Sequence, residues 1–304
     1  MNATRINPLV SVVIPCYNPK QLVRTLESVR RQTFTGWEAL CVDDGSEEEF
    51  ATIFQSMHDS RFSYHRLEQH RNANVARNYG IQHGRGRYIA MLDSDDEWEP
   101  SHLEAALRLI GKEKADGVYG SLVLRNGSSD RTVVTRAIRE GESTIDFLLS
   151  TGYGAQTSTL VMTTESAKTI GWDESLNRHQ DYDFVVRYCR QYKLVPLLEP
   201  TVIYHLSGGP KQMDFHSCIR FIRSVEDEIS PRIYLDYHRQ MLRVATHYAA
   251  GEEVLTYYRE TMAGCTPLVS LQEYLLLLRP QNRREAWRWK MRYLWRLLWL
   301  KVEI

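Results

Sequence analysis

Short apolar runs alternate with amphipathic segments along the first part of the chain. Leu9–Ile14 is a β-branched run followed by Pro15, so we expect a strand that ends at this proline. Apolar residues at helical spacing follow over residues 22–29, and residues 39–42 form a second apolar run. Such runs are typical of strands buried on both faces of a parallel sheet, so the pattern predicts a right-handed β-α-β unit.

The same alternation continues beyond this unit. A helix is predicted at residues 50–57, a polar stretch leads to a helix from about Val75 to His83, and Tyr88–Leu92 is another strand. Helices and strands that alternate in this way predict an α/β fold with a doubly wound sheet.

Beyond residue 100 the elements become shorter and mixed, and later mostly helical. Pro100 is expected to open a helix, and Asn126-Gly127 is a turn signal. We expect strands near residues 117–124, 159–162, 194–198 and 202–205, and helices near 181–191, 215–230, 234–248 and 252–262. The change of character after Gly208-Gly209-Pro210 predicts two domains, at residues 1–210 and 211–304.

Composition narrows the class of protein. In 304 residues, 38 Lys and Arg balance 38 Asp and Glu, so the net charge gives no reason to expect nucleic acid binding. Five widely spaced cysteines without a CxxC pair argue against a disulfide framework or a zinc site and favour a reducing cytoplasm. The first apolar run is too short for a signal peptide, and there is no apolar stretch of about 18 residues. We therefore expect a cytoplasmic protein that is neither exported nor membrane-spanning.

Polar clusters follow three of the predicted strands. They are Pro15–Asn18, Asp43–Ser46 and Asp93–Asp96. Because ligands bind beyond the carboxyl ends of the strands in open parallel sheets, the three clusters are expected to converge on one crevice. Each cluster alone has a second interpretation; Asp-Asp-Gly-Ser, for example, also makes an ordinary turn and helix cap.

Asp93 and Asp95 have the spacing of a metal site. In an extended segment residues i and i+2 face the same side, so both carboxylates can reach one cation. Mg²⁺ or Mn²⁺ accepts one or two protein carboxylates and completes its coordination with water and phosphate oxygens. Such an ion would neutralise a diphosphate and make it a better leaving group.

Five ordered motifs resemble those of the family 2 glycosyltransferases. They are Ser11–Asn18, Val42–Ser46, Ala76–Ile81, Tyr88–Asp96 and Ile170–Glu174, the last followed by Gln180–Asp183. The resemblance covers roughly residues 8–206. It implies the GT-A fold, with a nucleotide-sugar-binding half at about 1–98, an acceptor half at 99–210 and a helical C-terminal region.

The resemblance also implies roles for individual residues in binding a nucleotide sugar. Asp44 would accept a hydrogen bond from the imide N–H of uracil or thymine, so a UDP-sugar is the expected donor. Asp95 would be the principal metal ligand, and Asp93 would touch the ribose or the metal. The other implied donor contacts are Pro15, Tyr17, Asn18, Arg77 and Ser94, with Arg77 at the phosphates. A plainer interpretation of Arg77, as a solvated helix residue, stays open.

Asp181 resembles the family's catalytic base, which takes the proton from the acceptor hydroxyl. A displacement assisted by one base implies inversion at the anomeric carbon. Gln180 stands where the family's pair has glutamate, and the loss of that charge should reduce any rise in the pKa of Asp181. Asp183 is the alternative, because either acid could simply cap the helix that follows.

Three segments depart from the family pattern. His70–Asn72 stands in place of an Asn-x-Gly, and we expect Asn72 to keep the turn in a left-handed conformation. His205 is expected either to contact the metal or diphosphate or to be a structural residue. Gly208–Lys211 has the composition of a flexible lid whose lysine meets a phosphate.

The last predicted helix combines arginine with tryptophan. Arg284, Arg288, Arg292 and Arg296 recur every four residues, as do Trp287, Met291, Trp295 and Trp299. Such a helix suits a membrane surface, because tryptophan prefers the headgroup zone and arginine attracts anionic lipid. The alternative is that the tryptophans pack on the catalytic domain while the arginines extend outward.

Together these features predict an inverting, metal-dependent glycosyltransferase. It would move a sugar from a nucleotide diphosphate sugar to a hydroxyl of a saccharide or lipid-linked saccharide, in bacterial surface polysaccharide synthesis at the inner face of the cell membrane. One rival is a non-catalytic binding module with the same fold. A sugar nucleotidyltransferase would usually show a glycine- and basic-rich loop after the first strand, and a dehydrogenase would show GxGxxG there, whereas Pro15–Asn18 fits neither pattern.

Overall fold

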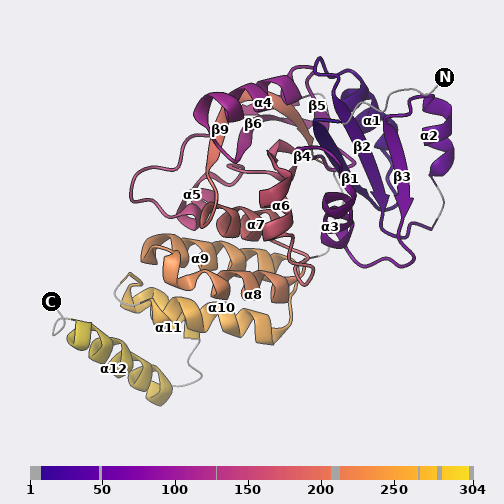
Figure 1. The fold of residues 1–304 in the computed structure, drawn as a ribbon. Helices are drawn as coiled ribbons and strands as arrows, with labels where there is room; N and C mark the ends of the chain where they lie inside the picture. Colours follow the sequence, from indigo (N-terminus) through magenta and orange to yellow (C-terminus); the bar gives the residue numbers. More distant parts are fainter. Residues whose placement is uncertain are drawn as a thin grey trace, which may run out of the picture. The chain divides into compact units, whose positions relative to one another are not determined.

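The computed structural model describes residues 8–47, 50–127, 129–206, 213–265, 268–278 and 283–300. The chain separates into two compact units, Met1–Lys211 and Gln212–Ile304. The first unit contains the sheet, and the described part of the second unit consists of helices and their connections (Figure 1).

The sheet of the first unit begins with a parallel half. Its strands are β1 (Val10–Cys16), β2 (Trp37–Asp43), β3 (Phe62–Arg66) and β4 (Tyr88–Met91), connected by α1 (Leu22–Arg30), α2 (Ala51–Met57) and α3 (Ala73–His83). β1 lies between β2 and β4 and is parallel to both, and β3 pairs in parallel with β2. The strand order therefore reverses at β1, which is where open α/β sheets leave a crevice for a ligand.

An antiparallel strand begins the mixed half of the sheet. β8 (Val161–Thr163) pairs with both β4 and β6 (Gly117–Asn126), giving the order β3-β2-β1-β4-β8-β6-β9-β5. The remaining elements are β5 (Glu97–Trp98), β7 (Ser129–Val133), β9 (Leu194–His205), α4 (His102–Glu113), α5 (Thr144–Thr151), α6 (Thr164–Ile170), α7 (Gln180–Cys189) and a 3-10 turn at Thr157–Thr159. The architecture agrees with the predicted α/β class.

Helix α3 packs closely on the central strand. All seven residues of β1 are buried. A Cβ added at Gly80 of α3 would lie 2.4 Å from Cγ1 of Val13, so glycine permits this approach of the helix to the strand. The close packing holds α3, which contains Arg77, against the centre of the sheet.

Some strands differ from the sequence prediction. β1 continues through Pro15, because the missing N–H of this proline faces β4, whose pairing with β1 has already ended at Val13. β3 was not predicted: it is the edge strand, and only Phe62 of its residues is buried, so its pattern is mostly polar. The two strands expected within residues 194–205 are one strand, β9.

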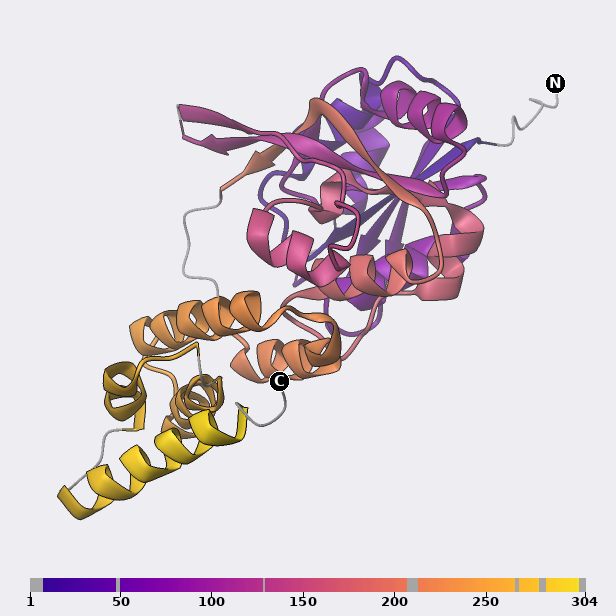
Figure 2. The same cartoon turned by 90° about the vertical axis from the view of Figure 1, so that its left-hand side faces the viewer.

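The second unit has its own apolar core. Its elements are α8 (Phe215–Ser224), a 3-10 turn at Glu226–Glu228, α9 (Pro231–His247), α10 (Glu252–Gly264), α11 (Leu271–Leu278) and α12 (Arg283–Leu300), coloured orange to yellow in Figure 2. Leu235 of α9, Met262 of α10, Tyr274 of α11 and Tyr293 of α12 meet in one buried cluster. None of the described helices has the length and apolar character needed to span a membrane.

Candidate active site

A cavity of about 460 Å³ opens where β1, β2 and β4 end. Its lining residues are Pro15, Cys16, Tyr17, Asn18, Pro19, Lys20, Gln21, Asp44, His70, Ala73, Arg77, Asp93, Ser94 and Asp95. The structure thus brings together all the residues predicted to contact the donor. Asp181 and His205 are not among the lining residues.

Asp44 lines this cavity and is almost fully buried. Its carboxylate accepts hydrogen bonds from the backbone N–H of Arg71 at 3.1 and 3.2 Å, and Nδ1 of His70 lies 2.9 Å from Oδ2. Burial raises the pKa of Asp44, and the contacts with Arg71 and His70 partly oppose that rise. The ring of Tyr17 stacks on His70 with 3.8 Å between the ring centroids and is 43% exposed.

The neighbouring acid, Asp43, organises the loops around Asp44 instead of entering the cavity. Oδ1 accepts from the backbone N–H and hydroxyl of Ser46 at 2.9 and 2.5 Å, and Oδ2 accepts from the Tyr64 hydroxyl at 2.5 Å. Ser46 Oγ in turn accepts from the backbone N–H of Asn18 at 2.8 Å. The partly buried bond between Asn18 and Ser46 therefore ties the loop after β2 to the loop after β1.

Asp93 and Asp95 lie in a tight turn and not in the extended segment that we predicted. The N–H of Asp96 donates to the carbonyl of Asp93 at 3.1 Å, which closes the turn. Helix α1 stabilises it, because Thr25 Oγ1 donates to the carbonyls of Ser94 and Asp96 at 2.9 and 2.8 Å. Both carboxylates still reach the cavity.

Asp96 supports this turn from the interior. It accepts from Ser158 Oγ at 2.6 Å and from the backbone N–H of His205 at 3.1 Å. Burial, followed by the charges of Asp93 and Asp95, raises the pKa of Asp96 well above its ordinary value. The side chain of His205 contacts Glu97, with 2.7 Å between Nε2 and Oε1, so its role as a metal or diphosphate ligand stays a prediction.

Arg77 of α3 links the turn after β4 to the start of α7. Its side chain is 5% exposed, and the guanidinium donates from Nη2 to Asp93 Oδ1 and from Nη1 to Gln180 Oε1, each at 2.8 Å. The same guanidinium lies over the Trp172 ring, 4.6 Å from the centroid. Arg77 is therefore not a solvated helix residue: it joins the turn that contains Asp93 to the start of α7.

Asp181 lies in the first turn of α7, next to Gln180. Burial raises the pKa of Asp181 to about 6; the charge of Arg77 opposes this rise, and the charge of Asp93 adds to it. Burial, followed by the charges of Asp96, Asp93, Asp95 and Asp181, raises the pKa of Tyr204. The alternative base, Asp183, forms an ion pair with Arg187 at 2.6 Å.

One residue of the site, His70, had no clear signal in the sequence, and two predictions for loops had other outcomes. His70 was noted only as part of a departure from the family pattern, yet it contacts both Tyr17 and Asp44. Asn72 does not adopt the expected left-handed conformation: its φ is −176°, and its side chain caps α3 by accepting from Asn74 and Val75. The lid predicted at Gly208–Lys211 lies outside the described residues.

The donor set at the turn fits a hard divalent cation. Asp93 and Asp95 supply two carboxylates to one cavity, which is the number that Mg²⁺ or Mn²⁺ commonly takes from a protein. Burial is the main cause of the raised pKa of Asp96, and the charges of Asp93 and Asp95 add to it; a cation would offset those two charges. Within the part of the chain that the structure describes, no group of three or more His, Cys, Asp or Glu side chains could hold a metal.

Known proteins with similar sequences are glycosyltransferases. A 208-residue match is 32% identical to the amylovoran biosynthesis glycosyltransferase AmsB of Erwinia amylovora and covers 64% of this chain and 69% of that protein. The Escherichia coli protein named UDP-Glc:alpha-D-GlcNAc-diphosphoundecaprenol beta-1,3-glucosyltransferase WfgD is 34% identical over 122 residues, covering 40% of this chain and 48% of WfgD.

The fold is similar to that of a solved protein, TarS of S. aureus. The crystal structure of TarS residues 1–349 in complex with UDP-GlcNAc matches with a TM-score of 0.67 at 16% identity, over 93% of this chain and 89% of that one. This likeness confirms the predicted α/β fold of GT-A type with a helical C-terminal region. The sequence model named "Glycosyl transferase family 2" matches residues 11–170, more than half of the protein. The chain therefore belongs to glycosyl transferase family 2 and is a glycosyltransferase.

Proposed function

We propose that this glycosyltransferase takes a UDP-sugar as its donor and transfers the sugar, with inversion, to a hydroxyl of a saccharide acceptor. The observation that carries the proposal is the single cavity shared by Asp44, Arg77, Asp93 and Asp95. It offers the Asp44 carboxylate for a base and two more carboxylates for a metal-bound diphosphate. The complex of the structurally similar TarS with UDP-GlcNAc supports the choice of donor.

Asp44 is the residue that would select the base. An ionised carboxylate has about four acceptor sites, so it can accept from an imide N–H while keeping its contacts with Arg71 and His70. Uracil offers this N–H and cytosine does not. The half-exposed Tyr17 ring supplies a surface on which a base can stack, and Pro15 and Asn18 line the same cavity.

Asp95 and Asp93 would hold Mg²⁺ or Mn²⁺ beside the diphosphate, and Ser94 lies between them on the cavity wall. The cation supplies charge neutralisation to the leaving diphosphate when it is bound. Arg77 adds a fixed positive charge at the same place, because its guanidinium is oriented by Asp93 and Gln180.

Asp181 would act as the base for the acceptor. Its carboxylate takes the proton of the acceptor hydroxyl as that oxygen forms a bond to the anomeric carbon, and the bond to the diphosphate breaks with its electron pair leaving on the diphosphate. The direction of attack opposite the leaving group inverts the anomeric carbon. A pKa of about 6 keeps Asp181 ionised at neutral pH and makes it a stronger base than an ordinary aspartate.

A lipid-linked saccharide on the inner face of a bacterial membrane is the acceptor that we propose. The support comes from the relatives, since AmsB is named for amylovoran biosynthesis and WfgD for a diphosphoundecaprenol-linked substrate. At the cytoplasmic face of the membrane the enzyme would have access both to nucleotide sugars and to a lipid-linked acceptor.

A thermal-shift panel of nucleotide sugars with Mn²⁺, followed by a donor-hydrolysis assay, tests the proposal. We expect stabilisation by UDP-sugars over CDP- and GDP-sugars, with loss of this shift in Asp44→Ala and Asp95→Ala. Asp236→Ala, in the helical unit, removes an aspartate far along the chain and should keep the shift.

Turnover separates an enzyme from a binding module of the same fold. Asp181→Asn should keep the thermal shift and lose hydrolysis and transfer. Equal hydrolysis by the wild type, Asp95→Ala and Asp181→Asn would contradict the catalytic proposal and favour the binding module. A nucleotidyltransferase would instead release pyrophosphate from UTP and a sugar phosphate.

A further inference from the structure

Helix α12 has one face that packs against the helical unit. Tyr293 is buried in the cluster formed with Leu235, Met262 and Tyr274, and its hydroxyl donates to the carbonyl of Val269 at 2.7 Å. Trp289 and Leu297, four residues before and after Tyr293, pack partly against the same cluster. Because residues four apart share a helix face, this face is already occupied by the protein's own core.

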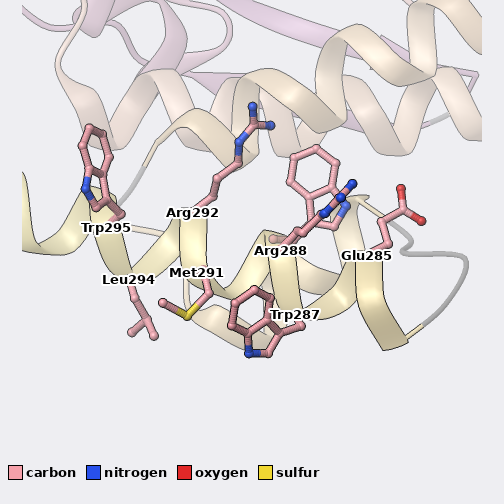
Figure 3. Close-up of a pocket in the computed structure, with 8 residues that line it drawn as sticks. Glu285, Trp287, Arg288, Met291, Arg292, Leu294 and Trp295 are labelled. Atoms are coloured by element: carbon pink, nitrogen blue, oxygen red, sulfur yellow. The ribbon is translucent and has the colours of Figure 1, made fainter.

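A second apolar face of α12 is exposed. The exposed fractions are 63% for Trp287, 45% for Met291, 37% for Leu294 and 61% for Trp295. Figure 3 shows Trp287, Met291 and Leu294 pointing to the same side of the helix, whereas Trp295 and Arg292 point to the other side. A shallow hollow of about 620 Å³ along α12 is lined by residues of this one helix, so it is an open groove and not an enclosed site.

Positive charge accompanies this exposed face. The basic residues of α12 are Arg283, Arg284, Arg288, Lys290, Arg292 and Arg296, against one acid, Glu285. Arg288 and Arg292 line the open groove beside Trp287 and Trp295. An exposed strip of tryptophan flanked by arginine is complementary to a surface that is apolar inside and anionic at its rim, as an anionic bilayer is.

The length and composition of α12 fit a helix that lies along such a surface. It has 18 residues, and none of the described helices is apolar enough to span a membrane. A helix with one face anchored in the protein core and the other exposed would lie parallel to the bilayer, with its tryptophans at headgroup depth.

We propose that exposed side chains of α12 form a docking surface for anionic lipid. Trp287, Met291 and Leu294 supply one side of this surface, and Trp295, Arg288 and Arg292 line the open groove beside it. The apolar side chains enter the headgroup–acyl boundary, and the two arginines pair with lipid phosphates. The proposal deepens the membrane setting of the proposed function, but lipid binding requires no turnover, so each can fail separately.

Flotation of the full chain with vesicles of phosphatidylcholine, with or without phosphatidylglycerol, tests this surface. We expect binding to the anionic vesicles to exceed binding to phosphatidylcholine and to weaken with added salt. Arg288→Gln with Arg292→Gln should reduce the anionic preference by about 30-fold. Trp287→Ala with Met291→Ala and Trp295→Ala should reduce binding to anionic vesicles by at least about tenfold.

Matched controls exclude trivial explanations. Leu198→Ala and Tyr248→Ala remove exposed apolar side chains outside α12 and should leave flotation unchanged. The donor thermal shift, which reports the catalytic unit, should persist in every α12 variant. The proposal would be overturned if the wild type bound vesicles equally with and without phosphatidylglycerol. It would also be overturned if the tryptophan variant bound anionic vesicles as strongly as the wild type. Self-association of the protein without lipid would also overturn the proposal if the same substitutions abolished it. The surface would then join two copies of the chain.

Discussion

Two hollows in the described part of the chain are built in opposite ways. The cavity of about 460 Å³ in the first unit is lined by the segments that follow β1, β2 and β4, by the loop before α3 and by α3 itself. The groove of about 620 Å³ in the second unit is lined by α12 alone. The larger hollow is the simpler one, because neighbouring side chains of one helix create it.

The difference lies in how the lining side chains are held. Asp44 is held by the N–H of Arg71, and Asp93 is held by Arg77, so contacts between distant segments orient the cavity's charges before any ligand arrives. Trp287 and Trp295 are more than half exposed. Preorganised charges suit chemistry that needs a fixed geometry, whereas an adaptable amphipathic strip suits a fluid surface. Convergence of segments, and not volume, therefore identifies the candidate active site.

The largest expected effect is that of replacing Asp181, which we propose as the base for the acceptor. Asp181→Asn should lower kcat by about 10³-fold, because an amide cannot take the proton of the acceptor hydroxyl. Steady-state transfer assays measure this loss. Asp183→Asn is the matched control: it removes the ion pair with Arg187, so Tm should fall while kcat stays within a few-fold. The reverse outcome would assign the base to Asp183.

Helix α12 offers a test of the difference between a packed and an exposed face. Tyr293→Ala should lower the free energy of unfolding of the helical unit by about 3 kcal/mol, because it empties a buried site and removes the bond to Val269. Trp287→Ala, three-fifths exposed, should change it by less than about 0.5 kcal/mol. Hydrogen exchange of α9 and α10 amides measures both, and equal losses would contradict the two-faced description.

Lowering the pH should reduce transfer activity, with a midpoint at the pKa of Asp181. Asp181 accepts a proton only when ionised, and its pKa is raised to about 6, so kcat/KM should fall about tenfold per pH unit below pH 6. The pH profile of kcat/KM measures this limb. The residual activity of Asp181→Asn provides the control, because its profile should lack the limb; a limb that persists there belongs to another group.

The smallest expected effect concerns the hydrogen bond between Arg77 of α3 and Gln180 of α7. In the wild type the charge of Arg77 lowers the pKa of Asp181. Gln180→Glu adds a negative charge beside Asp181, and the new carboxylate would pair with Arg77 and offset its charge. The acid limb should therefore move to higher pH, by about one unit. Gln191→Glu adds the same charge just beyond the other end of α7 and should leave the limb in place. A limb that stays or moves down in Gln180→Glu would show that Arg77 does not act on the base.

Local pattern was sufficient where neighbouring residues decide the outcome. The buried runs at β1, β2 and β4 and the helical spacing between them predicted the parallel half, and the carboxyl ends of parallel strands meet at one edge, so Asp44, Asp93 and Asp95 were expected together. The edge strand β3 was missed because a strand with one neighbour is only partly buried and has no clear apolar pattern.

Contacts between distant residues were decided by the tertiary structure. Arg77 and Gln180 are 103 positions apart, so their hydrogen bond depends on how α3 and α7 pack on the sheet. The turn at Asp93–Asp95 depends on Thr25 of another helix. The sequence of α12 determined that the helix is rich in tryptophan and arginine, but only the packing of Tyr293 decided which of its two apolar faces is buried and which is exposed.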